Sequence, residues 1–190
     1  LRPPDAPGRA GRARGQRLEH RQGVGVGVGL IGRADAEGVK ADGRAPTLLG
    51  GYGGFEIAQK PSYSGSRGAG WLERGGVYAL ANIRGGGEFG PRWHEAALKE
   101  NRIKSFEDFI AVAEDLVRRN VTSTPHLGIQ GGSNGGLLMG NMLTMRPDLF
   151  GAIVCQVPLL DMRRYHLLLA GASWTGEYGN PDDPGEWAFL

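Results

Sequence analysis

The stretch GGSNGG at Gly131–Gly136 decides the fold of this chain of 190 residues. It follows a short apolar run and precedes a helix-like run. A serine placed between a strand and a helix and flanked by glycines is typical of a nucleophile elbow. The turn must be so tight that the serine backbone is strained, and side chains at Gly131 and Gly135 would collide with the neighbouring strand and helix. The stretch predicts a nucleophile at Ser133, with the backbone N–H groups of the following helix directed at a developing oxyanion.

Apolar runs on both sides of the elbow predict further strands. A helix is expected over 105–120, with Ser105 as its N-cap and acidic residues in its first turn, and the elbow helix is expected to stop before Pro147. Apolar runs without polar alternation, separated by helices, indicate a parallel sheet that is covered on both faces. The predicted fold class is therefore α/β. The expected strands span 46–49, 76–83, 126–130 and 150–157.

Composition excludes several function classes. The net charge of +2 is too small to indicate a nucleic-acid or membrane partner, and no apolar stretch approaches the ~20 residues of a membrane span. The single cysteine, Cys155, rules out an intrachain disulfide and suits the cytoplasm, although a periplasmic or secreted protein without disulfides is also compatible. No His, Cys, Asp or Glu cluster has metal-ligand spacing. We therefore expect neither a metal nor a cofactor.

The N-terminal residues 1–36 differ from the rest, because they are rich in Arg, Pro and Gly. Gly27, Gly29 and Gly32 match the G-x-G-x-x-G pattern, but a dinucleotide site needs a helix after the glycines, and the segment at 34–38 is short and ends in Gly. We expect an irregular or disordered basic extension over 1–36 and a catalytic domain over 37–190.

Two Gly-rich loops directly follow predicted strands. The first contains Tyr52 and Phe55, and the second contains Arg84 and Glu88. Loops at the carboxyl ends of strands are where open α/β sheets place their chemistry. We expect Arg84 and Glu88 to shape their loop rather than to take part in the reaction.

Four motifs follow one another along the chain: GGYGGFE at Gly50–Glu56, NIRGGGEFG at Asn82–Gly90, GGSNGG at Gly131–Gly136 and RPDLFG at Arg146–Gly151. In this order and at these spacings they resemble the catalytic domain of the prolyl oligopeptidase family of serine peptidases. The resemblance covers roughly Gly38–Leu190 and implies an α/β-hydrolase sandwich with a mostly parallel sheet. Asn after the nucleophile and the YGGF loop resemble the proline-specific members more than oligopeptidase B, which typically has Ala after the serine.

The resemblance implies a role for each matched residue. Ser133 would attack short peptides after proline and form an acyl-enzyme, and the backbone N–H of Asn134 and the hydroxyl of Tyr52 would form the oxyanion hole. Aromatic faces suit a pyrrolidine ring, and Leu159 replaces a smaller β-branched residue of the family. The residues that match the proline-accepting pocket are Phe55, Leu159, Trp174 and Tyr178.

A serine nucleophile needs a base, and the base needs an orienting carboxylate. On this fold the order along the chain is Ser, then Asp or Glu, then His. His166 is the only histidine after Ser133, and its counterpart in the family is not catalytic, so we expect a structural or surface histidine. The resemblance places the catalytic Asp and His beyond Leu190. The chain would then be a fragment whose sheet is incomplete at the C-terminal end and has an exposed parallel edge strand.

Two other interpretations stay open. The chain could belong to a related α/β-hydrolase, namely an oligopeptidase B, an acylaminoacyl peptidase or an esterase. Alternatively, the chain could belong to another class of protein and be a non-catalytic fragment. Reaction of Ser133 with a fluorophosphonate probe would discriminate, because labelling requires an activated serine.

The missing base leads to a first prediction. We expect turnover of a Gly-Pro-anilide substrate by this chain to be absent or very weak, because the serine has no general base. Release of the aniline product measures the rate. Full activity that Ser133→Ala abolishes would contradict the prediction and would place His166 in the triad.

Overall fold

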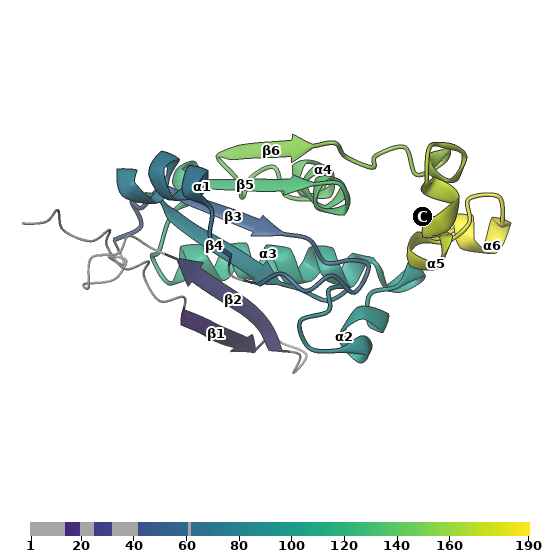
Figure 1. Cartoon of the computed structure of the whole chain (residues 1–190), viewed down its shortest axis with the longest axis horizontal. Coiled ribbons are helices and arrows are strands. Elements are labelled where there is room, and N and C mark those ends of the chain that lie inside the picture. Colours follow the sequence, from purple (N-terminus) through teal and green to yellow (C-terminus); the bar gives the residue numbers. More distant parts are fainter. Residues whose placement is uncertain (1–13, 20–24, 32–41, 61) are drawn as a thin grey trace, which may run out of the picture.

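The computed structural model describes residues 14–19, 25–31, 42–60 and 62–190. Within these residues the strands form a six-stranded sheet in the order β1-β2-β4-β3-β5-β6 (Figure 1). The strands β4, β3, β5 and β6 are parallel to one another. Strand β2 pairs antiparallel with β4, and β1 pairs antiparallel with β2. The strands are β1 Arg14–Glu19, β2 Gly25–Ile31, β3 Thr47–Gly51, β4 Val77–Asn82, β5 Leu127–Gly132 and β6 Ala152–Gln156.

Helices connect the parallel strands, and short helices follow the last of them. The α-helices are α1 Gly65–Gly70, α2 Pro91–Glu95, α3 Ile103–Arg118, α4 Asn134–Met145, α5 Thr175–Tyr178 and α6 Pro184–Trp187. Short 3-10 helices span Leu72–Arg74, Lys99–Asn101, Thr124–His126, Tyr165–Leu167 and Gly171–Trp174. Figure 1 shows α5 and α6 beyond the carboxyl ends of the parallel strands. Short helices therefore make up much of the chain after β6.

One row of apolar residues crosses the parallel part of the sheet. Leu49 of β3 is in register with Ala79 of β4 and with Ile129 of β5, which pairs with Ile153 of β6. Helices α3 and α4 cover this face, and α3 lies behind the sheet in Figure 1. Complete burial of a leucine, isoleucine or phenylalanine side chain in this core stabilises the fold by roughly 1.5–3 kcal/mol. The helix residues in this core include Phe106, Phe109, Val112, Ala113, Leu116, Leu138, Met139 and Met142.

The opposite face of the sheet is covered unevenly. Tyr78 of β4 is buried, and the Arg67 guanidinium of α1 lies 4.0 Å from its ring centroid. Buried and half-buried residues alternate along β5, and β6 is mostly exposed. The sequence predicted cover on both faces throughout, but among the described residues only β4 is buried along almost its whole length. The exposed edge strand was expected, and β6 occupies that position at the end of the sheet.

The N-terminal residues correct one expectation. The sequence predicted irregular structure throughout 1–36, but β1 and β2 lie in this segment, and β2 pairs with β4. The physical reason is the alternation of Gly and Val over 25–28, which has the period of two that a strand requires. The low complexity of this segment does not prevent it from forming a strand. The other residues of this segment lie outside the described ones, and the domain boundary near residue 36 stays a prediction.

The start of α3 corrects another expectation. The helix begins at Ile103, and Ser105 lies inside its first turn instead of capping it. The Ser105 hydroxyl is buried and donates to the carbonyl oxygen of Arg84 at 2.6 Å and to that of Gly53 at 3.3 Å. Ser105 thus joins the two Gly-rich loops, because these carbonyl groups need a donor when they are buried. The elbow helix ends at Met145, before Pro147, as predicted.

A buried ion pair fixes the second Gly-rich loop to α3. Asp108 accepts hydrogen bonds from the backbone N–H of Arg84 at 3.0 Å, from its Nε at 2.8 Å and from its Nη2 at 2.6 Å. Both side chains are almost fully buried. These contacts hold the second Gly-rich loop against α3. Arg84 therefore shapes its loop, as the sequence suggested.

The burial of this pair predicts a large loss of stability in Asp108→Asn. The substitution leaves the Arg84 charge buried without its counterion, which costs about 3–5 kcal/mol. Urea unfolding measures the free energy. Asp148→Asn is the matched control, because Asp148 pairs with Arg146 on the surface, and its stability should stay close to that of the unchanged chain. An equal loss in both variants would contradict the prediction.

Candidate active site

Ser133 lies in the turn between β5 and α4, and its backbone is in the left-handed region. Its φ is 58° and its ψ is −119°, and its side chain is exposed. A non-glycine residue with such a φ costs on the order of 1–3 kcal/mol and persists where its surroundings fix it. Its N–H donates to the carbonyl oxygen of Gln156 at 3.1 Å, which holds the turn against β6. The strained serine that the sequence predicted is therefore present.

The glycines beside the serine allow the turn to close. A Cβ at Gly131 would overlap the carbonyl oxygen of Gly135 in α4, and a Cβ at Gly135 would lie 2.9 Å from the carbonyl oxygen of Gly51 in β3. Both neighbours are backbone atoms that cannot move aside without disturbing the sheet or the helix. The predicted collisions at these two positions are confirmed.

The loop after β3 lies directly beside the elbow. Strands β3 and β5 are parallel neighbours, with Gly50 opposite Gln130, so the residues that follow them emerge side by side. The Asn134 side-chain Nδ2 donates to the carbonyl oxygen of Tyr52 at 2.6 Å. The structure thus brings Tyr52, Ser133 and Asn134 together at the carboxyl edge of the sheet. The N–H of Asn134 lies in the first turn of α4, where a helix offers no internal acceptor.

Four residues predicted to line a pocket gather in one apolar cluster. The rings of Phe55 and Tyr178 meet edge to face, with 5.6 Å between their centroids, and Trp174 meets Phe55 at 6.4 Å. Leu159 packs against the same cluster, together with Leu137 of the elbow helix. Phe55 and Trp174 are half-buried, whereas Tyr178 is fully buried. Residues from three distant segments therefore gather next to the elbow helix. The rings of Phe55, Trp174 and Tyr178 form an aromatic wall there.

The side chain of Asn134 connects this wall to the loop after β3, a role that sequence reasoning missed. The Tyr178 hydroxyl donates to Asn134 Oδ1 at 2.7 Å, while Asn134 Nδ2 holds the Tyr52 carbonyl. Burial raises the pKa of Tyr178 well above its usual range, so the hydroxyl stays protonated and keeps donating at neutral pH. The sequence suggested only the backbone N–H of Asn134, because no local pattern shows where its amide points.

Glu88 also contributes to the loop structure. Its Oε1 accepts from the backbone N–H of Gln59 at 2.7 Å, and this bond links the two Gly-rich loops. Burial raises the pKa of Glu88, although hydrogen bonds from backbone N–H groups oppose the shift. Its contacts are to the protein's own backbone, as expected of a residue that shapes the loop.

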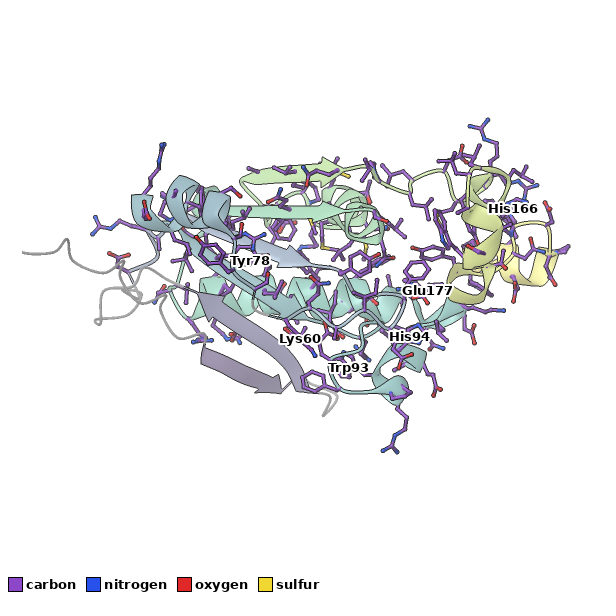
Figure 2. The ribbon with its side chains drawn as sticks, in the orientation of Figure 1. Lys60, Tyr78, Trp93, His94, His166 and Glu177 are labelled. Carbon is purple, nitrogen blue, oxygen red and sulfur yellow. The ribbon has the colours of Figure 1, made fainter. Side chains whose placement is uncertain are left out.

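Both histidines of interest pair with carboxylates and not with Ser133. The His166 Nε2 lies 2.9 Å from Asp182 Oδ2, and the His94 Nε2 lies 2.8 Å from Glu177 Oε2. Figure 2 shows His94 and Glu177 next to each other, with His166 apart from both. In the described part of the chain, no hydrogen bond joins a histidine ring to the hydroxyl of Ser133.

The described residues contain neither a metal-binding cluster nor a membrane-spanning helix. No group of three or more His, Cys, Asp or Glu side chains there could hold a metal ion. No helix in that part of the chain has the length and apolar character needed to cross a bilayer.

Comparison with known proteins agrees with this arrangement. The family model for the prolyl oligopeptidase family matches residues 61–188. The chain is 61% identical over 170 residues to the uncharacterized peptidase y4nA of Sinorhizobium fredii, which covers 90% of this chain and 23% of that protein. It is 46% identical over 149 residues to the prolyl endopeptidase of Dictyostelium discoideum, which covers 78% of this chain and 20% of that protein.

A solved structure shows the same likeness in three dimensions. The post-proline cleaving enzyme from Rickettsia typhi matches with a TM-score of 0.88 and 46% identity, over 94% of this chain and 25% of that one. The chain thus spans about a quarter or less of the length of the relatives it matches. Strand order, elbow geometry and sequence identity lead to the same assignment, and the chain belongs to the prolyl oligopeptidase family of serine peptidases.

Proposed function

We propose that this chain carries the nucleophile, the oxyanion hole and the proline pocket of a serine endopeptidase that hydrolyses short peptides after proline. The observation that carries the proposal is the meeting of three parts at one edge of the sheet. These parts are the strained Ser133, the loop of Tyr52, and the aromatic wall that Asn134 joins to that loop. The names of the relatives, prolyl endopeptidase and post-proline cleaving enzyme, support the same substrate class.

In the proposed reaction, the Ser133 Oγ attacks the carbonyl carbon that follows the proline ring. The negative charge that develops on the carbonyl oxygen accepts hydrogen bonds from the N–H of Asn134 and the hydroxyl of Tyr52. The bond to the leaving amine then breaks as its nitrogen receives the proton that Oγ gave up, and water later hydrolyses the ester on Ser133. A base must take the Oγ proton, and no histidine within the described residues is bonded to that hydroxyl. Absent or very weak turnover by the chain as given stays a prediction.

The surroundings of the pocket favour proline over a basic residue. Glu177, next to Tyr178, is a buried carboxylate that could attract an arginine side chain. Its two oxygens, however, already bind the Phe55 N–H, the Arg102 guanidinium and the His94 ring. A substrate arginine would therefore have to displace an existing cation, whereas a pyrrolidine ring needs only the aromatic faces of Phe55 and Trp174.

The partner that fits this site is a short peptide that contains proline. The near-neutral chain supports no nucleic-acid partner. We also propose the cytoplasm as the compartment, because the chain has a single cysteine, Cys155, and that thiol is free.

Peptide boronic acids provide a direct test, because boron accepts the Ser133 Oγ and becomes a tetrahedral anion that resembles the reaction intermediate. We expect this chain to bind an acylated proline boronic acid about tenfold or more tightly than the arginine boronic acid. The ¹¹B NMR spectrum should show tetrahedral boron, and titration should provide both dissociation constants.

Ser133→Ala is the control for covalent binding, since it removes the Oγ and should abolish the tetrahedral signal. Tighter binding of the arginine compound would contradict the proline assignment and favour an oligopeptidase B-like specificity. Absence of the tetrahedral signal with either compound would favour a non-catalytic protein.

The oxyanion hole leads to a separate prediction for Tyr52→Phe. Loss of one oxyanion donor lowers transition-state stabilisation by about 10²–10³-fold, so affinity for the proline boronic acid should fall by a similar factor. The same titration measures the effect. Tyr63→Phe is the matched control, because Tyr63 is an exposed phenol in the loop before α1 and its loss should leave the affinity unchanged. Equal affinity of the Tyr52 variant and the unchanged chain would remove Tyr52 from the oxyanion hole.

A further inference from the structure

Glu177 is a buried carboxylate that connects three separate segments of the chain. It lies in α5, directly before the pocket residue Tyr178, and is 6% exposed. Its Oε1 accepts from the backbone N–H of Phe55 at 2.9 Å and from the Arg102 guanidinium. Its Oε2 lies 2.8 Å from the Nε2 of His94. Figure 2 shows these two side chains next to each other. One carboxylate thus holds α5, the loop after β3 and the segment that leads into α3.

Arg102 extends the same network to the other end of the loop. Its Nη1 donates to the carbonyl oxygen of Gly53 at 2.7 Å, and its guanidinium carbon lies 5.2 Å from the ring centroid of Tyr178. The segment from Gly53 to Phe55 is therefore held at its first residue by Arg102 and at its last by Glu177. Tyr178, a member of the aromatic wall, directly follows Glu177 in the chain, and its ring faces the Arg102 guanidinium.

The backbone of Phe55 shows why such anchors are needed. Its φ is 57°, and that of the next residue, Glu56, is 55°. Left-handed backbone is unfavourable for a bulky residue and persists only where the surrounding structure fixes it. The hydrogen bond from the Phe55 N–H to Glu177 acts at this strained residue, and the same residue presents a ring to the pocket.

The charge on Glu177 is sustained by its partners. Burial alone would raise the pKa of Glu177, but the positive charge of Arg102 and the hydrogen bonds from His94 and the Phe55 N–H outweigh burial and lower it. A lowered pKa means that the stabilisation is fully present above the usual pKa of a glutamate and is lost as the pH falls through the lowered value. The network is therefore intact at neutral pH.

We propose that Glu177, acting with Arg102, is a positioning residue that sets the geometry of the proline pocket without touching the substrate. The inference rests on the proposed function, because it concerns the pocket of that same site. Glu177 fixes the backbone of Phe55, Arg102 fixes Gly53, and both hold Tyr178 against the Phe55 ring. The pocket then has one shape before the substrate arrives, which reduces the free energy lost on binding.

A purely structural role would have a different consequence. A residue that only stabilises the fold changes binding of every ligand in proportion to the folded fraction. A residue that fixes the geometry of the pocket changes the affinity for a ligand with a proline ring. It leaves the affinity for a ligand without a side chain unchanged. The glycine boronic acid has the same reacting group and no ring, so it reports on Ser133 and the oxyanion hole alone.

The test compares the proline and glycine boronic acids on the chain at about pH 7. Glu177→Gln keeps the size of the side chain and removes its charge, which weakens a hydrogen-bonded ion pair by a factor of roughly ten to one hundred. We expect the dissociation constant of the proline compound to rise by about that factor and that of the glycine compound to stay unchanged. Glu186→Gln is the matched control, because Glu186 of α6 pairs instead with Lys99 and with the backbone N–H of Asn180.

Arg102→Lys keeps the test decisive if Glu177→Gln does not fold. Lysine retains the charge but lacks the fork that reaches Glu177 and Gly53 together, so a smaller loss confined to the proline compound is expected. The inference is overturned if the variants bind both compounds as the unchanged chain does, or lose both in equal proportion. Failure of the unchanged chain to prefer the proline compound overturns the proposed function first, and this inference with it.

Discussion

The close packing of β5 against α4 is the constraint on which the site depends. The chain must reverse between Gly132 and Asn134, and it does so by placing Ser133 in the left-handed region with its side chain exposed. Glycines at the contacts are required, since a Cβ at Gly135 would lie 2.9 Å from a backbone oxygen of β3. The same packing places the N-terminus of α4 behind the serine. Strand, strained residue and helix end thus form one unit.

Around that unit, the polar contacts align parts of the chain that are far apart in sequence. Asn134 follows the serine directly, and its side chain binds both the Tyr52 carbonyl and the Tyr178 hydroxyl. The proposed oxyanion hole and the proposed pocket are therefore fixed relative to each other by one amide. Buried networks of this kind specify a single geometry when every member has a partner. Glu177 adds a second connection between the same two parts, through Phe55 and Arg102.

The sequence predicted the parts of this structure that have local causes. The elbow, its strand and its helix follow from glycine spacing and from apolar periodicity, and the four motifs indicated the family. Other features depend on distant partners. Ser105 was expected to cap α3, but its hydroxyl binds carbonyl groups of the two Gly-rich loops. The Gly–Val alternation over 25–28 has the period of a strand, but its place in the sheet depends on pairing with β4. The partners of Glu177 are distant in sequence, and no local pattern predicts them.

The central claim is that Ser133 and the aromatic wall form one site for a proline-containing peptide. A crystal structure of the chain with the acylated proline boronic acid tests it most directly. The account predicts a bond from boron to the Ser133 Oγ, one boronate oxygen near the Tyr52 hydroxyl, and the pyrrolidine ring against Phe55 and Trp174. A boron atom bonded to Ser133 with its ring outside that wall, or a compound bound away from Ser133, would contradict the account.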